Sequence, residues 1–587
     1  MARPVRIANF SGAMGDRFSA FEEAVHGDPD VVIGDSMAEI TMSMVVAGFH
    51  ENRAARRGFF SEYFLRQLRP QLPAIAEKRI KVVTNAGVYH PAGLAEAIRT
   101  EVAAQGLDLK VAYVTGDDLT DTAKDLIADG QLGHLETGAA LEIDPSELLA
   151  VNAYLGGWGI KTALDEGADI VITGRVADAS LVTGPAAWWH GWERGELDKI
   201  AGATAAAHII ECGPQATGGN FAGFTDLPEN TLPGFPIAEL AEDGSFVITK
   251  RPEDGGAVTV DTVTAQLMYE IQGPRYLNPD VTWHTDSITL AQDGPDRVRV
   301  TGAQGSAASE TTKVGINFQR GYRGATWLFP TGLDVDAKID VLKTQAERAR
   351  QDHPVEELHF FVCGQPVPDP QDQWQATVAV QVAVAAADQK TVSGFLNQFC
   401  SYGLGSIPGF YIDMTQMYSM GGQPRIDYWP GLVRQADLHH QVHLPDGRVL
   451  DIAPPPDTAV FTGQPETPSS APASFSPTTT VPFGQVVYAR TGDKGANANL
   501  GVWARDEAAW PWLAAFLTAD RLRELLNCPR DVAIERYEQP NLHGISFVLR
   551  GYFPPSGSAN LALDQIGKSL GEFLRARHVD VPTALLH

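Results

Sequence analysis

The chain has 587 residues, too many for one hydrophobic core, because cores stop growing at about 250–300 residues; we therefore expect two or three domains. Hydrophobic residues make up 44% and charged residues 20%, close to the averages of globular proteins, which argues against global disorder. The 72 acidic against 45 basic residues give a net charge of −27, which argues against a nucleic-acid partner but not against a small anionic substrate in a local positive pocket.

Cysteines and apolar runs indicate the compartment. The four cysteines, Cys212, Cys363, Cys400 and Cys528, form no close pair, so we expect reduced thiols and no zinc site, with Cys212 a core thiol. The N-terminus has no apolar stretch typical of a signal sequence, and no run of eighteen apolar residues occurs. We expect a cytoplasmic protein without a membrane partner.

Residues 1–205 repeat a pattern of a short β-branched run followed by a helix-like segment. The predicted strands are 5–9, 31–34, 81–84, 109–114 and 170–173, and the predicted helices include 18–25, 59–67, 92–105 and 145–156. This alternation predicts an α/β body with a mostly parallel sheet and helices on both faces.

Residues 206–463 form a second, β-rich part of that body. Strand-like runs occur at 245–250, 258–271, 297–303 and 375–385, a helix is predicted at 392–400, and residues 445–447 predict a hairpin turn.

A linker and a small domain follow. Residues 464–480 are nearly all Pro, Ser, Thr or Ala and cannot pack a core. Residues 481–587 then predict strands at 484–489, 500–504, 532–537 and 545–551, and helices at 512–526 and 561–577. A small α+β domain with its helices on one side of an antiparallel sheet fits this order.

The first loop that could bind a ligand follows the first strand. Backbone amides at a strand–loop–helix corner favour a phosphate or carboxylate, and the residues in question are Ser11, Gly12, Gly15 and Asp16. The loop lacks the P-loop and dinucleotide-binding patterns. The alternative is a plain turn in which Asp16 caps the helix.

A pair of carboxylates follows the second strand. Asp35 ends the strand and Glu39 lies four residues further on, a spacing at which two carboxylates can share a helix face. One could then be protonated as an acid while the other stays ionised. The alternative is a helix cap and a solvated surface glutamate.

Two further strand ends carry polar residues. Asn85 and Gly87 follow the third strand, and Arg175 and Asp178 follow the strand at 170–173. An arginine at such a corner can bind a carboxylate or phosphate while its neighbour orients it, although a salt bridge that only staples the corner fits as well. Ligands of parallel sheets bind at the carboxyl ends of the strands, which favours a site here.

Two glycine-bearing segments lie outside these corners. The first, after an apolar segment, is Gly218, Gly219 and Asn220, where a backbone could approach a ligand closely or turn tightly. The second, ARTGDKGANANLG at 489–501, predicts an anion-binding loop between two strands, with a tight hairpin as the alternative. Its candidate binding residues are Arg490, Asp493, Lys494 and Asn497.

Three histidines do not predict a metal centre. His439, His440 and His443 lie in a predicted strand, in which 439 and 443 face one way and 440 the other. We therefore assign no metal ligands.

Together these residues resemble the acyclic terpene utilisation (AtuA) family. The matching segments are IANFSGAMGDR, IGDSMAEITM, TNAG, ITGRVADASL, ECGPQATGGNF and ARTGDKGANANLG, which span nearly the whole chain. The resemblance implies catabolism of citronellol- and geraniol-like terpenes, whose intermediates are carried as coenzyme A thioesters, and a ferredoxin-like C-terminal domain.

The function expected from these observations is that of an enzyme on a branched or hydroxylated acyl-CoA, a lyase or hydro-lyase. Asp35 and Glu39 would be the acid/base pair that transfers protons to and from the substrate, and Arg175, oriented by Asp178, would bind a carboxylate or an enolate. The alternatives are a hydrolase of a thioester, ester or lactam, and a non-catalytic scaffold. No cofactor is expected beyond coenzyme A within the substrate, and we expect a homo-oligomer.

Overall fold

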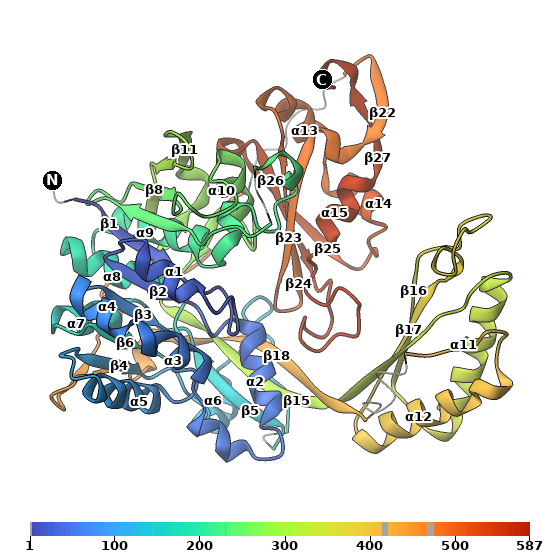
Figure 1. Ribbon diagram of the computed structural model, residues 1–587, viewed down its shortest axis with the longest axis horizontal. Helices are drawn as coiled ribbons and strands as arrows, with labels where there is room; N and C mark the ends of the chain where they lie inside the picture. The colour runs from blue at the N-terminus through green and yellow to red at the C-terminus, as the bar shows by residue number, and fades with distance from the viewer. Residues whose placement is uncertain (1–2, 145, 229–230, 414–420, 467–474, 587) are drawn as a thin grey trace.

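The computed structural model describes residues 3–144, 146–228, 231–413, 421–466 and 475–586. Its body is built on an eleven-stranded sheet (Figure 1). The centre holds parallel strands in the order β1 (Val5–Asn9), β2 (Val31–Gly34), β3 (Lys81–Thr84), β6 (Ile170–Ile172) and β4 (Val111–Thr115). The α/β class predicted from the sequence is confirmed.

Antiparallel strands extend this parallel centre on both sides. Beyond β1 lie β7 (Ile237–Leu240), β8 (Phe246–Thr249), β12 (Val298–Thr301) and β11 (Thr289–Gln292), and beyond β4 lie β19 (Gln441–His443) and β20 (Val449–Asp451). The turn at 445–447 joins β19 to β20, as predicted. The parts 1–205 and 206–463 thus contribute strands to the same sheet.

Helices cover both faces of the sheet because its strands alternate apolar side chains between them. One face packs against α1 (Ala20–His26), α3 (Glu62–Leu68), α4 (Leu72–Lys78) and α5 (Pro91–Ala104). The other packs against α7 (Trp158–Asp165), α8 (Ser180–His190), α9 (Leu197–Ile210) and α10 (Val260–Leu267). In β2, Val32 faces the first layer and Val31 and Ile33 the second.

A second sheet leads away from the body along the 18-residue strand β15 (Thr311–Leu328). This strand pairs with β5 (Leu148–Ala153), β18 (Gln423–Arg434) and β17 (Ala379–Ala386), and β16 (Glu357–Cys363) forms the edge. Figure 1 shows the far end of this sheet as a separate lobe with α11 (Val335–Asp352) and α12 (Gln389–Ser401). Helix α2 (Glu39–Gly48) packs against β15 and β18, where Oγ of Ser43 donates to Oδ1 of Asn317 at 2.8 Å.

The C-terminal domain has the antiparallel order β23 (Val487–Lys494), β24 (Asn497–Ala504), β26 (Gly544–Arg550), β25 (Ala533–Gln539). Helices α13 (Trp510–Phe516), α14 (Ala519–Leu526) and α15 (Leu570–Ala576) share one core with the sheet, and β22 (Thr478–Pro482) pairs with β27 (His578–Pro582). The helix predicted at 512–526 is therefore two helices, and that at 561–577 is limited to α15.

Two predicted elements have the wrong type. The helix predicted at 145–156 is strand β5, whose buried residues pair with β15; residue 145 itself lies outside the described residues. The strand predicted at 258–271 contains helix α10, because Thr259 and Thr262 form a reciprocal capping box. The apolar residues of α10 also recur at helical spacing, which the alternating pattern had obscured. No helix in the described part of the chain is long and apolar enough to cross a membrane.

Candidate active site

A charged cluster lies at the carboxyl ends of β2, β3 and β6. Its members are Asp35, Glu39, Arg175, Asp178, Glu270, Lys313, Lys494 and Lys568. Asp35, directly after β2, is 5% exposed. Its Oδ1 accepts hydrogen bonds from Nδ2 of Asn85 at 2.7 Å and from the backbone N–H of Met37 at 2.9 Å. The backbone N–H of Ser36 donates to Oδ1 of Asn85 at 2.6 Å. These contacts fix the carboxylate and leave Oδ2 with no hydrogen bond from the described residues.

The environment of Asp35 favours its neutral form. Burial raises the pKa of Asp35 to about 7, and the negative charge of Asp178 acts in the same direction. Arg175 and the hydrogen bond from Asn85 oppose the rise. A carboxyl group that titrates near neutrality can give or take a proton at physiological pH.

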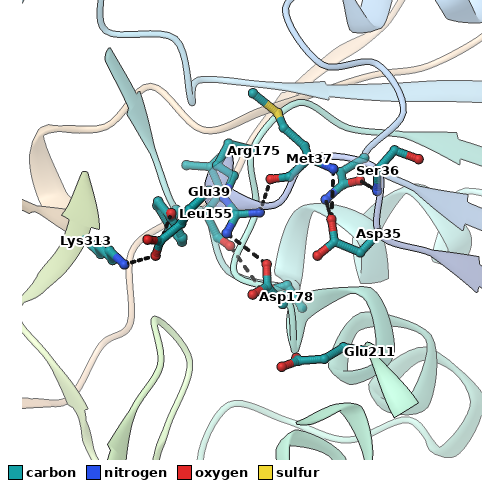
Figure 2. Close-up of polar contacts among 12 residues, drawn as sticks. Asp35, Ser36, Met37, Glu39, Leu155, Arg175, Asp178, Glu211 and Lys313 are labelled. Atoms are coloured by element: carbon teal, nitrogen blue, oxygen red, sulfur yellow. Dashed lines mark hydrogen bonds and ion pairs between the residues drawn. The ribbon is translucent and has the colours of Figure 1, made fainter. Parts of the chain in front are cut away.

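Arg175 lies at the centre of the charged cluster and is 1% exposed. Its guanidinium donates to the carbonyl oxygen of Met37, pairs with Oδ1 of Asp178 at 2.8 Å, and lies 4.0 Å from the ring centre of Tyr154. Figure 2 shows it between Asp35 on one side and Glu39 on the other. The salt bridge expected between Arg175 and Asp178 is present, and Arg175 also connects the segments that follow β6 and β2.

Asp117 supports Arg175 through its backbone. One oxygen, Oδ2, accepts from the backbone N–H of Arg175 at 2.8 Å and from Nδ2 of Asn152 at 2.9 Å. Burial raises the pKa of Asp117 to about 7. Asp117 was not among the residues predicted from the sequence, because no local pattern relates it to the end of β6 at Ile172.

Glu39 forms an ion pair with Lys313 of β15. Burial would raise the pKa of Glu39, but Lys313 and Lys494 lower it below its ordinary value. The hydroxyl of Tyr154 lies 3.4 Å from Oε1 of Glu39 and 2.9 Å from the hydroxyl of Tyr428. Glu39 is therefore held as an anion, in contrast to Asp35.

The C-terminal domain contributes two lysines to the charged cluster. Nζ of Lys494 lies 2.7 Å from Oε2 of Glu270, and Nζ of Lys568 lies 3.5 Å from Oε1 of Glu270 and contacts the hydroxyl of Tyr269. Burial would lower the pKa of Lys494, but Glu270 and Glu39 raise it well above its ordinary value. Lys494 thus remains a cation although it is largely buried.

Two family models match the chain. One, for the acyclic terpene utilisation family protein AtuA, covers residues 5–444, and the other, for the AtuA ferredoxin-like domain, covers residues 481–580. The chain belongs to the AtuA family. No curated protein and no solved structure matches it.

In this AtuA chain the loop at 11–16 supports Asp35 and does not present an open anion site. The backbone N–H of Gly12 donates to Oδ2 of Asp16 at 3.1 Å, so a carboxylate of the loop already occupies that donor. Oγ of Ser11 contacts the carbonyl oxygens of Ala13 at 2.8 Å and Asp35 at 3.1 Å. Helix α1 begins only at Ala20, and Gly15 has a φ of +93°, as a turn requires.

Asn85 and Gly87 have different roles in their corner. Asn85 bridges Asp35 and Ser36, as described above. A Cβ on Gly87 would lie 2.5 Å from the carbonyl oxygen of Thr173, so the glycine allows the segments that follow β3 and β6 to pack together.

All but the last residue of the ARTGDKG segment lie in strand β23, and two residues join β23 to β24, so the segment is the tight hairpin that was the alternative to an open loop. Arg490 donates to the carbonyl oxygen of Asn220 at 3.1 Å and to Oε1 of Gln215, so it joins the two domains. Gly218 and Gly219 shape the turn that presents Asn220, where the backbone N–H of Gly219 donates to the carbonyl oxygen of Pro214 at 2.9 Å.

The other polar residues of this hairpin have separate partners. Nδ2 of Asn497 donates to Glu136 of the body, and Oδ1 accepts from the backbone N–H of Gly551 at 2.9 Å. Burial raises the pKa of Asp493 to about 7. Of the four residues proposed as an anion-binding loop, Lys494 brings a positive charge to Glu39 and forms an ion pair with Glu270.

The cysteines, the histidines and two residues that the sequence did not predict complete the comparison with the expected site. Cys212 is partly exposed as a residue, but burial raises the pKa of its thiol well above the ordinary value, as expected of an inert thiol; the four cysteines are free. No group of three or more metal-binding side chains occurs among the described residues, and His443 stacks on Tyr113 with ring centres 4.4 Å apart.

Lys313 and Glu270 were not among the residues predicted from the sequence. Lys313 reaches the charged cluster from the antiparallel strand β15, and Glu270 from a segment with a positive φ.

Proposed function

We propose that this AtuA chain is a catabolic enzyme, a lyase or hydro-lyase that acts on a branched or hydroxylated acyl-CoA. The AtuA family takes part in acyclic terpene utilisation, and the family resemblance implies intermediates carried as coenzyme A thioesters. The observation that carries the proposal is Asp35, a fixed carboxyl group that titrates near neutrality and has one free oxygen among the described contacts.

The cations of the charged cluster fit an anionic substrate. Lys313 and Lys494 are 21% and 19% exposed, so both can reach a carboxylate or a thioester oxygen that gains negative charge. Arg175 is too deeply buried to leave its partners, and it acts on Asp35 through its charge. The contact with the substrate anion that the sequence analysis gave to Arg175 is therefore better suited to the lysines.

The variant Asp35→Asn tests this proposal, because the amide keeps the contacts with Asn85 and Met37 but cannot exchange a proton. Calorimetric titration with a panel of branched and hydroxylated acyl-CoA esters should show binding by both proteins, and turnover should fall by about 100-fold or more in the variant. Asp169→Asn is the matched control, since Asp169 pairs with Lys81 at 2.8 Å at the amino ends of β6 and β3, away from the charged cluster at their carboxyl ends.

Product analysis in heavy-oxygen water separates the alternatives. A hydro-lyase exchanges solvent oxygen at a hydroxyl carbon, whereas a hydrolase places it in a carboxylate. Unchanged turnover in Asp35→Asn, or solvent oxygen in a carboxylate, would overturn the proposal. If none of the esters binds saturably, the non-catalytic scaffold is favoured.

A further inference from the structure

A buried pair, Glu211 and His208, lies beside the charged cluster. His208 is in the last turn of α9 and Glu211 follows the end of that helix; they are 1% and 7% exposed. Nε2 of His208 lies 3.0 Å from the carbonyl oxygen of Tyr269, and Nδ1 lies 3.2 Å from Oε1 of Glu211. Both ring nitrogens therefore face oxygens, Nε2 in a hydrogen bond and Nδ1 at ion-pair distance without hydrogen-bond geometry.

The chemistry of these contacts requires a further proton on the pair. A carbonyl oxygen only accepts hydrogen bonds, so Nε2 of His208 carries a hydrogen. An unprotonated Nδ1 facing an ionised carboxylate would place two lone pairs against each other. One further proton must therefore lie on Nδ1 of His208 or on Oε1 of Glu211.

The second oxygen of Glu211 has no partner. Oε2 is buried, and no described residue donates to it or accepts from it. Asp178, Lys494, Tyr276 and Cys212 are the charged and titratable groups that face Glu211 besides His208. Figure 2 shows Glu211 next to Asp178, below Asp35. A buried polar atom without a partner is costly, so this oxygen fits a group supplied by a ligand.

We propose that Glu211, backed by His208, is the base of the reaction and works opposite Asp35 as the acid. Glu39, the partner that the sequence suggested for Asp35, is held as an anion by Lys313 and faces away from Asp35 across Arg175. Among the described residues Glu211 has no lysine or arginine within ion-pair distance; its one ion-pair partner is His208, and Oε2 has no hydrogen-bond partner. This assignment rests on the proposed function.

In the hydro-lyase reaction each proton has a defined donor and acceptor. Oε2 of Glu211 takes the proton from the carbon next to the thioester, while the proton on Oε1 passes to Nδ1 of His208. The electron pair of the C–H bond forms the new C=C bond, and the C–O bond to the hydroxyl group breaks. The departing hydroxide takes the proton of Asp35 and leaves as water. Burial raises the pKa of Glu211, which keeps the starting proton on the pair.

The experiment separates the two roles by exchange of the substrate's carbon-bound proton in deuterated water, with hydroxymethylglutaryl-CoA as the first probe of the panel. Asp35→Asn should retain this exchange and lose water elimination, whereas Glu211→Gln and His208→Gln should lose both by about 100-fold or more. Glu538→Gln is the matched control, since Glu538 is also 7% exposed but lies in the C-terminal domain beside Arg536. Exchange that persists in Glu211→Gln would overturn the assignment.

A second measurement does not depend on turnover. Proton NMR of the ligand-free protein should show a low-field resonance for the proton on Nδ1 or Oε1, absent in Glu211→Gln and His208→Gln and present in Asp35→Asn and Glu538→Gln. If the resonance has this pattern but no acyl-CoA reacts, the proposed function fails while the protonated pair stands. If the resonance is missing in the wild type, the pair is not the base.

Discussion

Lys494 of the C-terminal domain lies 2.7 Å from Glu270 of the body. Hairpin β23–β24 therefore carries a cation into the charged cluster of its own chain. Glu270 has a φ of +58°, a backbone conformation that costs about 1–3 kcal/mol in a residue other than glycine, and it contacts Lys568 as well. The domain that the sequence separates by a linker thus contributes to the candidate site.

Replacing Lys494 tests whether this cation binds substrate. Lys494→Ala should weaken acyl-CoA binding by about 10-fold or more, because a hydrogen bond to a charged group contributes about 1.5–3 kcal/mol. Isothermal calorimetry with the panel measures the change in affinity. Lys343→Ala, on the exposed face of α11, is the control and should bind normally. Equal affinity in the two variants would make the hairpin an assembly element.

The sequence predicted the centre of the fold better than the site. Strands 5–9, 31–34 and 81–84 have the predicted bounds, because strands buried on both faces are continuous apolar runs that end at glycine or a polar residue. The contact of Asn85 with Asp35 follows from the parallel order of those strands. Lys313 and Glu270 could not be predicted, because their positions depend on strand pairing and domain docking between segments far apart in the chain.

The pH dependence of stability tests the state of Asp35. Its pKa is raised from 3.8 to about 7 on folding, so the folded chain keeps a proton that the unfolded chain releases. The stability that the neutral group provides is fully present below about pH 4 and is lost as the pH rises to about 7. Relative to Asp35→Asn, the wild type should lose ~3 kcal/mol between about pH 5 and pH 7, at about 1.4 kcal/mol per pH unit.

Denaturant unfolding of both proteins across this pH range measures the difference. The other buried carboxyl groups, such as Asp117, are common to both proteins and cancel in the comparison. Parallel curves for the wild type and Asp35→Asn would mean that Asp35 is ionised throughout the range.

Arg490 offers a test of domain docking. Its guanidinium joins β23 to Asn220 and Gln215 and lies 4.5 Å from the ring centre of Tyr269. Arg490→Ala should speed amide hydrogen exchange in 487–504 while the central sheet stays protected, because the substitution removes only interactions between the two domains. Substrate affinity should fall less than in Lys494→Ala. The opposite ranking would return Arg490 to the substrate contacts expected from the sequence.

Gly87 tests the packing of the corners without any substrate. Its Cβ would lie 2.5 Å from the carbonyl oxygen of Thr173 and 2.8 Å from Cα of Pro91, and neither backbone atom can move without displacing a strand end or a helix start. Gly87→Ala should therefore cost about 1–3 kcal/mol of stability. Because Asn85 is two residues away, the displacement should also lower turnover. Gly48→Ala, at the end of α2 with nothing within 4 Å of the added methyl group, is the control and should keep both stability and turnover. Equal unfolding midpoints for the two variants in denaturant would show that the corner can open, and that the position of Asp35 does not depend on this close approach.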